Sequence, residues 1–175
     1  MAKNILIGVT GGIAAYKTAD LINLFRKRGD DVKIIMTKSA MEFITPLTFQ
    51  VLTGNQVYFD MFGVDRDIKH ISLSKWADIL IIVPATANII GKIAGGIADD
   101  LLTTTVISLP DTVCKFVAPA MNTNIWKNKI LRKNVKILQE NNFVIIPPRS
   151  ARLACGDYGE GALAKVEDIV KVVKK

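Results

Sequence analysis

Cysteine and histidine are scarce in this chain of 175 residues, which has two cysteines, Cys114 and Cys155, and one histidine, His70. Two cysteines without paired spacing exclude a disulfide framework and a cysteine–histidine zinc site, and they fit a reducing compartment. No apolar run approaches the roughly 20 residues that a membrane-spanning helix needs. The sequence therefore predicts a cytoplasmic protein with no membrane segment and no metal site.

Negative charge is also in short supply, because 23 Lys and Arg face 16 Asp and Glu and leave a net charge of +7. Several basic residues gather in one segment: Lys127, Lys129, Arg132, Lys133 and Lys136. Such a cluster could contact nucleic acid or a phosphorylated ligand, or it could be the solvated face of a helix. No helix-turn-helix or aromatic RNA-binding pattern accompanies it, so we expect no nucleic-acid partner.

Hydrophobic residues, in contrast, are abundant. They make up 50% of the chain against 22% charged residues, which excludes wholesale disorder. The length predicts a single domain, residues 1–175, with a substantial core. The mean hydropathy of +0.30 is high for a soluble protein of this size, and excess apolar surface is typical of subunit interfaces. We therefore expect a homo-oligomer. The start, MAKNILIGVT, reads as a first strand rather than a signal peptide.

The segment 76–88, WADILIIVPATAN, is the clearest structural signal. Its apolar run, 79–83, lacks polar alternation, which is typical of a parallel strand covered on both faces. Pro84 cannot donate a hydrogen bond to a sheet, and Ala85, Thr86, Ala87 and Asn88 follow it. Small and polar residues beyond the carboxyl end of a parallel strand lie where α/β sheets bind ligands. Alternatively, Thr86 or Asn88 only caps the next helix.

The first 36 residues read as a βαβ unit, with strands over 5–9 and 32–36 and a helix over 13–28. The turn Thr10-Gly11-Gly12 is not GxGxxG, and no acidic residue ends the second strand, which argues against a nicotinamide dinucleotide. Thr37-Lys38-Ser39 stands there instead and could donate hydrogen bonds to a phosphate. A mononucleotide is therefore favoured.

The remaining elements repeat this pattern. We expect helices over 40–52 with an interruption at Pro46, and over 89–98, 100–109, 126–140 and 165–173. Strands are expected over 57–59, 113–118 and 143–146. Cys114 is expected in the core of its strand. The segment 119–122, PAMN, repeats the sequence of strand, proline, small residue and asparagine, so two adjacent strands bring similar loops to one sheet edge.

Two further segments have open interpretations. His70 follows a polar loop, 63–69, shortly before the central strand, which predicts exposure near a cleft, although a lone histidine is usually structural. The segment 150–163, SARLACGDYGEGAL, has three glycines and no strong periodicity. It is either a flexible linker or a loop that closes over a ligand and carries Cys155 with it.

Together these motifs resemble the homo-oligomeric flavin-containing cysteine decarboxylases. PATAN at 84–88, His70, PAMNTNIW at 119–126 and LACGDYGEGAL at 153–163 span essentially the whole chain. Thr86 stands where serine is common, and Ile89 and Ile125 replace a usual threonine and methionine. These exchanges retain the hydroxyl at position 86 and the apolar bulk at position 125.

The resemblance implies a fold and an activity. The fold would be a three-layer α/β/α Rossmann-like flavoprotein sandwich, with about six parallel strands in the order 3-2-1-4-5-6 and the flavin cleft between the Gly11-Gly12 turn and PATAN. The activity would be that of a lyase that decarboxylates 4'-phosphopantothenoylcysteine to 4'-phosphopantetheine in coenzyme A biosynthesis, through a thioaldehyde and an enethiolate. Such enzymes form trimers or dodecamers of trimers, with the flavin at a subunit boundary. No fused ligase domain is expected, so a separate phosphopantothenate–cysteine ligase would act upstream.

The resemblance also implies roles for individual residues. FMN would be bound by Gly11, Gly12, Ser39, Pro84, Ala85, Thr86, Asn88, Thr104 and Thr105. The catalytic residues would be His70, Asn122 and Cys155, the last as proton donor in the final reduction. The substrate would be bound by Met121, Asn122, Ala154 and Gly156, and residues 147–163 would cover it. A cysteine acid must stay protonated until the reduction, so we expect Cys155 to be shielded and away from lysines.

Three other functions stay open. An oxidative decarboxylase of a peptide C-terminal cysteine would stop at the enethiol, and the LACGDYGEG segment argues against it. A flavin prenyltransferase would not be expected to carry PAMN and the cysteine loop. A non-catalytic flavin-fold protein that regulates a phosphatase would usually carry an acidic tail, whereas this chain ends in VVKK.

Overall fold

The structure, a computed structural model, describes residues 2–62 and 67–173. Six parallel strands form the central sheet in the order β3-β2-β1-β4-β5-β6, which confirms the predicted order. The strands are β1 (Asn4–Val9), β2 (Asp31–Met36), β3 (Val57–Tyr58), β4 (Ile79–Ala85), β5 (Cys114–Pro119) and β6 (Phe143–Ile145). The chain reverses its direction of travel across the sheet between β1 and β4, so a topological switch point lies there.

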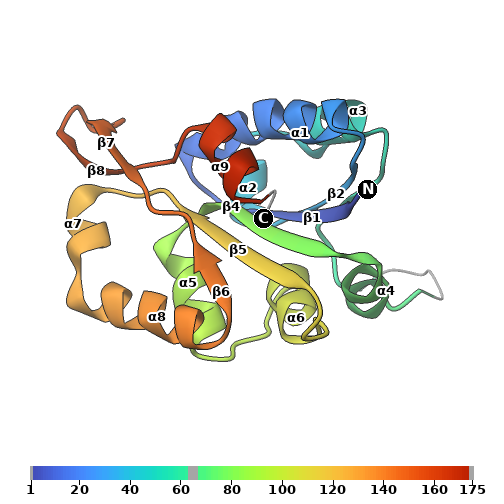
Figure 1. Ribbon diagram of the computed structural model, residues 1–175. Helices are drawn as coiled ribbons and strands as arrows, with labels where there is room; N and C mark the ends of the chain where they lie inside the picture. Colours follow the sequence, from blue (N-terminus) through green and yellow to red (C-terminus); the bar gives the residue numbers. More distant parts are fainter. Residues whose placement is uncertain (1, 63–66, 174–175) are drawn as a thin grey trace.

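Helices cover both faces of the sheet, as the predicted three-layer fold requires (Figure 1). One face carries α1 (Lys17–Lys27), α3 (Pro46–Thr53) and α9 (Val166–Val172). The other face carries α4 (Lys69–Trp76), α5 (Ala87–Ala94), α6 (Leu101–Ile107) and α8 (Lys129–Glu140). Among the described residues, no helix is long and apolar enough to cross a membrane.

The two-sided burial explains the continuous apolar runs of the central strands. In β4, Ile79 and Ile81 pack into the core beneath α1 and α9, whereas Leu80 packs into the core beneath α5 and α8. All seven residues of β4 are buried. Alternate side chains of a strand point to opposite faces, so each face of a fully covered strand needs its own apolar set.

Several of the predicted helices are divided into shorter ones. The helix expected over 13–28 is a short 3₁₀ helix, η1 (Ile13–Tyr16), followed by α1, and Pro46 begins α3 after the short α2 (Lys38–Met41). The helix expected over 126–140 is α7 (Thr123–Lys127) followed by α8, because the Asn128 Oδ1 accepts from the Ile130 N–H at 2.9 Å and starts a new helix.

Two predictions about single residues are wrong. Cys114 is the first residue of β5 and is exposed, because burial along this strand begins only at Phe116. His70 lies half-buried in the first turn of α4, a helix that the sequence pattern did not indicate, rather than at the end of a loop. The predicted loop over 63–69 therefore ends before Lys69, and residues 63–66 lie outside the described part of the chain.

The glycine-rich segment is an ordered hairpin rather than an irregular loop. Strands β7 (Arg149–Arg152) and β8 (Tyr158–Ala162) pair antiparallel in a separate two-stranded sheet. The hairpin stands beside α7 (Figure 1), and the Met121 N–H donates to the Gly161 carbonyl at 2.9 Å. The PAMN loop and the hairpin are thus joined by a backbone hydrogen bond.

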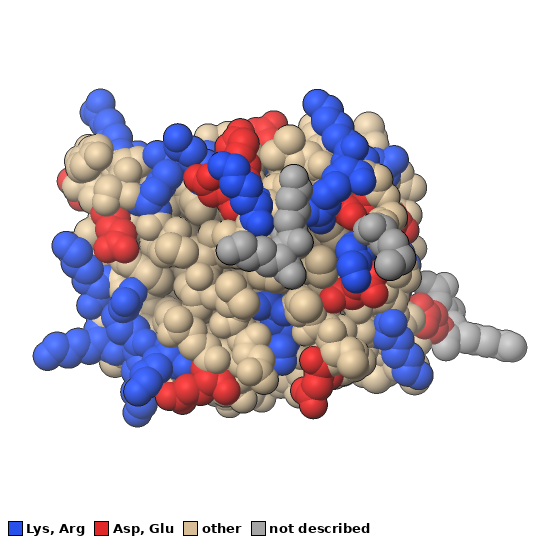
Figure 2. Space-filling view, in the orientation of Figure 1, with Lys and Arg blue, Asp and Glu red and all other residues tan. Residues whose placement is uncertain are grey.

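Basic side chains gather at the end of the molecule where α7 and α8 lie (Figure 2). Lys127, Lys129, Arg132, Lys133 and Lys136 are all exposed there. The Arg132 guanidinium stacks on the Trp126 ring, 4.7 Å from its centroid. Since none of these residues lines the cavities described below, the arrangement favours the solvated face of a helix over a ligand site.

Candidate active site

The Thr10 hydroxyl joins the ends of the two central strands. It donates to the Pro84 carbonyl at 2.6 Å and accepts from the Thr86 N–H at 3.1 Å. Thr10 is 2% exposed, so this hydroxyl uses both its donor and its acceptor inside the fold. The Thr86 side chain in turn accepts from the Ile89 N–H at 3.4 Å and caps α5. The two loops at the switch point are therefore fixed relative to each other.

Gly11 allows a third loop to approach. A Cβ atom built on Gly11 would lie 2.8 Å from the backbone of Ser39, closer than real side chains come. Ser39 lies at the start of α2, after the capping residue Thr37. The turn after β1 and the turn after β2 thus pack backbone to backbone, which places Ser39 beside the ends of β1 and β4.

Two adjoining cavities open over these loops, with volumes of about 560 Å³ and 500 Å³. We call them the hairpin cavity, which is lined mainly by η1, the PAMN loop and the β7–β8 hairpin, and the α2 cavity, which is lined by the turn before α2, the segment 59–62 and the start of α6. Gly11, Thr86 and Asn88 line both cavities. A ligand bound at these three residues could therefore reach into either space.

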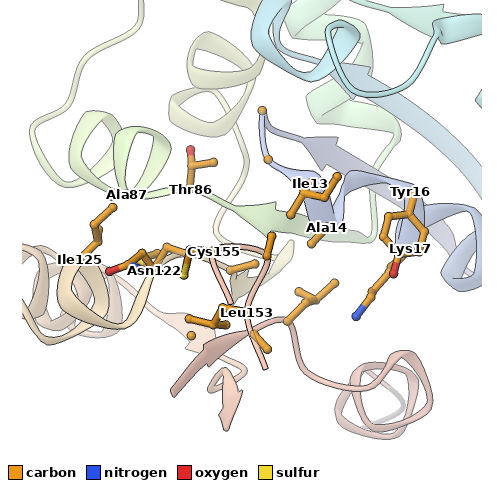
Figure 3. A pocket seen from close by; sticks show the side chains of 18 of the residues that line it. Ile13, Ala14, Tyr16, Lys17, Thr86, Ala87, Asn122, Ile125, Leu153 and Cys155 are labelled. Carbon is orange, nitrogen blue, oxygen red and sulfur yellow. Dashed lines mark hydrogen bonds between the residues drawn. The ribbon is translucent and has the colours of Figure 1, made fainter. Parts of the chain in front are cut away.

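Asn122 and Cys155 meet in the hairpin cavity (Figure 3). The Asn122 Oδ1 accepts from the Asn124 N–H at 2.8 Å and caps α7. This bond turns the Asn122 amide nitrogen toward Cys155, with 3.6 Å between Nδ2 and Sγ. The Cys155 thiol donates to the Asp157 carboxylate, with 3.5 Å between Sγ and Oδ2. In this single chain Cys155 is exposed, not shielded as expected, and its two hydrogen-bond partners carry no positive charge.

The structure brings most of the predicted site residues to the cavities. Gly12, Met121, Asn122, Ala154 and Cys155 line the hairpin cavity, and Ser39 lines the α2 cavity. Pro84 and Ala85 are buried in β4 and hold the loop after it.

Like Pro84 and Ala85, four further predicted residues line neither cavity: His70, Thr104, Thr105 and Gly156. The Thr105 hydroxyl donates to the Leu101 carbonyl at 2.6 Å inside α6. The Thr104 hydroxyl lies 3.4 Å from the Met61 sulfur. Within one chain, His70 is not part of the site.

Several residues at the cavities escaped the sequence analysis: Thr10, Lys17, Arg152 and Asp157. Thr10 and Lys17 lie in the βαβ unit. Thr10 could have been found, because it is a polar residue directly after a buried strand. Asp157 follows Cys155 with one glycine between them. No sequence pattern marks Arg152, because its position depends on the hairpin.

An ion pair borders the α2 cavity. The Lys92 ammonium contacts both carboxylate oxygens of Asp99 at 2.8 Å and one oxygen of Asp100 at 3.6 Å. The hydrogen bond with Asp99 raises the pKa of Lys92 above its ordinary value, and the same bond lowers the pKa of Asp99. Both groups therefore stay charged at neutral pH.

A six-stranded parallel sheet with a glycine turn and two polar loops at its switch point defines a nucleotide-binding α/β protein. The chain belongs to the flavoprotein family, whose model matches residues 1–175. A protein of Streptococcus mutans named as a probable phosphopantothenoylcysteine decarboxylase is 44% identical, over 100% of this chain and 99% of its own length. The bifunctional coenzyme A biosynthesis protein CoaBC of Bacillus subtilis is 43% identical over 99% of this chain, which spans only 43% of that protein.

Solved structures give the same picture. A mutant PPC decarboxylase complexed with pantothenoylaminoethenethiol superimposes with a TM-score of 0.91 and 36% identity, covering 99% of this chain and 97% of the other. The FMN-binding protein AtHal3 superimposes with a TM-score of 0.87 and 36% identity, covering 99% of this chain and 96% of the other.

Proposed function

We propose that this protein is an FMN-dependent lyase that decarboxylates 4'-phosphopantothenoylcysteine to 4'-phosphopantetheine. One observation carries the proposal: Asn122 and Cys155, far apart in the sequence, approach to 3.6 Å in a cavity that adjoins the glycine turn. The similarity to phosphopantothenoylcysteine decarboxylases supports the same substrate.

The residues around the cavity junction fit FMN. The absence of a side chain at Gly11 lets the turn after β1 pack against Ser39, which brings the two turns together at the cavity junction, and Lys38 adds a positive charge to the polar wall of the α2 cavity. Gly11, Gly12, Ser39, Thr86 and Asn88 would hold the cofactor. Bound FMN would supply a two-electron acceptor and donor next to the hairpin cavity.

The chemistry explains why both a redox cofactor and an acid are needed. A cysteine carboxylate cannot leave easily, because the resulting carbanion has nowhere to delocalise. Oxidation of the CH₂–SH group to a thioaldehyde provides that electron sink, and loss of CO₂ then leaves an enethiolate. Reduction to the thiol requires a proton at the α-carbon. Asn122 donates to the substrate carboxylate, since its oxygen is already engaged in capping α7, and Cys155 supplies the proton.

The cavity also suggests how the substrate is oriented. Lys17 lies on the opposite side of the hairpin cavity from Asn122 and Ile125 (Figure 3). With its cysteine end at Asn122, the elongated substrate would extend toward Lys17. A lysine at that end can neutralise a phosphate. The charged ends of the substrate would thus be bound at two separate points.

The site is completed by a second copy of the chain. Apolar side chains at the cavities are exposed in the single chain, among them Tyr16 at 55% and Phe62 at 79%. Exposed apolar surface of this kind is typical of subunit interfaces. His70, which lines neither cavity of its own chain, would then act at the site of a neighbouring copy.

The deciding experiment is mass spectrometry of 4'-phosphopantothenoylcysteine incubated with the purified protein, without an external reductant. The flavin absorbance of the same sample tests for FMN. We expect a yellow protein and a product that has lost one CO₂ with no net oxidation.

Other outcomes would replace the proposal. Loss of CO₂ together with two hydrogens would indicate the oxidative, peptide-type decarboxylase. A colourless protein that leaves the substrate unchanged would refute the enzyme and favour a non-catalytic protein of the same fold.

A further inference from the structure

We propose that Asp157 is a positioning residue that orients the hydrogen of the Cys155 thiol and places a negative charge beside its sulfur. The Asp157 carboxylate accepts from this thiol, with 3.5 Å between Oδ2 and Sγ. The other neighbour of the sulfur, the Asn122 amide nitrogen at 3.6 Å, is a donor. A sulfur between one donor and one acceptor has a single orientation for its own hydrogen, which points toward Asp157.

The backbone builds this contact. Gly156, between the two residues, has a φ of +94°, a conformation that residues with side chains rarely adopt. The Leu153 N–H donates to the Asp157 carbonyl at 2.8 Å, and the Gly156 N–H donates to the Leu153 carbonyl at 2.9 Å. These bonds close a tight turn at the tip of the β7–β8 hairpin and place the side chains of residues 155 and 157 together.

The charge of Asp157 suits the role of Cys155 in the proposed function. Each turnover replaces a carboxylate by a C–H bond, so it consumes one proton. Cys155 transfers this proton to the α-carbon and then remains as a thiolate. A carboxylate beside the sulfur repels that second negative charge. Because Asp157 is exposed, water at its carboxylate can return the proton to the sulfur. Asp157 thereby holds the thiol hydrogen in one orientation at the start of each turnover.

The first test needs no substrate. We compare the rates at which iodoacetamide alkylates Cys155 in the wild-type protein and in Asp157→Asn, resolving the two cysteines by peptide mass spectrometry. Exposed charge pairs contribute about 0.2–1 kcal/mol, so we expect Cys155 to react about one and a half to fivefold faster in Asp157→Asn. Cys114 is also exposed and serves as an internal reference whose rate should not change.

Matched variants separate this role from a general effect on the hairpin. Glu160→Gln removes the same charge from β8 without touching the thiol, so the reactivity of Cys155 should stay as in the wild type. Asp157→Glu retains the carboxylate and should restore most of the wild-type rate. A Cys155 in Asp157→Asn that reacts at the wild-type rate would overturn the proposal.

The second readout is the product, and it rests on the proposed function. We expect Asp157→Asn to release a larger share of decarboxylated but unreduced enethiol than the wild type and Glu160→Gln do. Exclusive formation of the reduced thiol by Asp157→Asn would contradict the positioning role. If the wild type itself forms no reduced thiol, the proposed function fails, and the alkylation rates still decide whether Asp157 controls the thiol.

Discussion

At the scale of single residues, the hairpin cavity carries different polar groups at its two sides. Asn122 presents a donor at one side because its oxygen caps α7, and the half-buried Lys17 presents a cation at the other. Lys17 is the first residue of α1, directly after η1, so the split between the two helices sets its position. A substrate with a carboxylate at one end and a phosphate at the other matches this arrangement.

Lys17→Met should therefore reduce the preference for the phosphorylated substrate. Hydrogen bonds to charged groups contribute about 1.5–3 kcal/mol, so we expect kcat/KM for phosphopantothenoylcysteine to fall about tenfold or more. The value for the unphosphorylated pantothenoylcysteine should change little, because that substrate lacks the phosphate. Lys133→Met, at an exposed site on α8, is the control. An equal fall for both substrates would contradict a contact with the phosphate.

The sequence identified those site residues that follow strands directly. Thr86 and Asn122 could be predicted because a buried strand and a proline precede each of them. Lys17 and Arg152 reach the cavity through η1 and through the hairpin, neither of which has a sequence pattern of its own. Cys114 was misplaced because a strand's apolar run does not tell where its buried part begins.

At the scale of elements, an ion pair and a helix cap fix the segment between α5 and α6. Lys92 on α5 reaches across to Asp99, and Asp100 caps α6 by accepting from the Thr103 N–H at 2.8 Å. The pKa of Asp99 in the folded chain is lowered by its hydrogen bond with Lys92. A carboxyl with a lowered folded pKa stabilises the fold above its unfolded pKa, and this contribution disappears as the pH falls through the folded pKa.

Asp99→Asn should consequently be slightly less stable than the wild type at neutral pH, and the difference should close in acid. The Asp99 side chain is 55% exposed and the Lys92 side chain 22%, so solvent reaches the pair, the difference stays small and salt weakens it. Urea unfolding of both proteins across this pH range measures it. In a Lys92→Met background, the Asp99 substitution should have no further effect. A difference that persists in acid would show that Asp99 acts through something other than this ion pair.

Elements with strong periodicity were predictable, and their junctions were not. The buried strands and the amphipathic α8 follow from apolar patterns that need no tertiary information. The break at Asn128 depends on a single cap, and no side-chain cap marks the start of α1 at Lys17. Strand β8 lacks apolar alternation because its glycines occupy the positions that face Thr123 of α7 and the PAMN loop, so the hairpin could not be recognised.

At the scale of the whole molecule, one chain holds only part of the proposed site. Cys155 and Asn122 lie on the hairpin cavity, whereas His70 lies in α4, which packs against α6 on one face of the sheet. His70 lines neither the hairpin cavity nor the α2 cavity of its own chain. If His70 acts in the reaction, a neighbouring copy must bring it, and each site then combines residues from two chains.

Complementation tests this division of the site. Cys155→Ser should stop at the enethiol and His70→Asn should lose the first oxidation, so neither variant alone forms the reduced thiol. In oligomers assembled from equal amounts of both chains, about a quarter of the sites would combine a wild-type His70 with a wild-type Cys155 from another chain. Co-expressed variants should thus regain a corresponding fraction of wild-type turnover, measured as reduced thiol by mass spectrometry.

The control is a mixture of the two variants purified separately and combined without subunit exchange. This mixture should form no reduced thiol, which excludes transfer of released enethiol from one variant to the other. Recovery only in the co-expressed sample would establish that His70 and Cys155 of one site belong to different chains. Equal inactivity of both samples would contradict a site shared between two chains. If the His70→Asn variant alone forms the reduced thiol, His70 has only a structural role in α4.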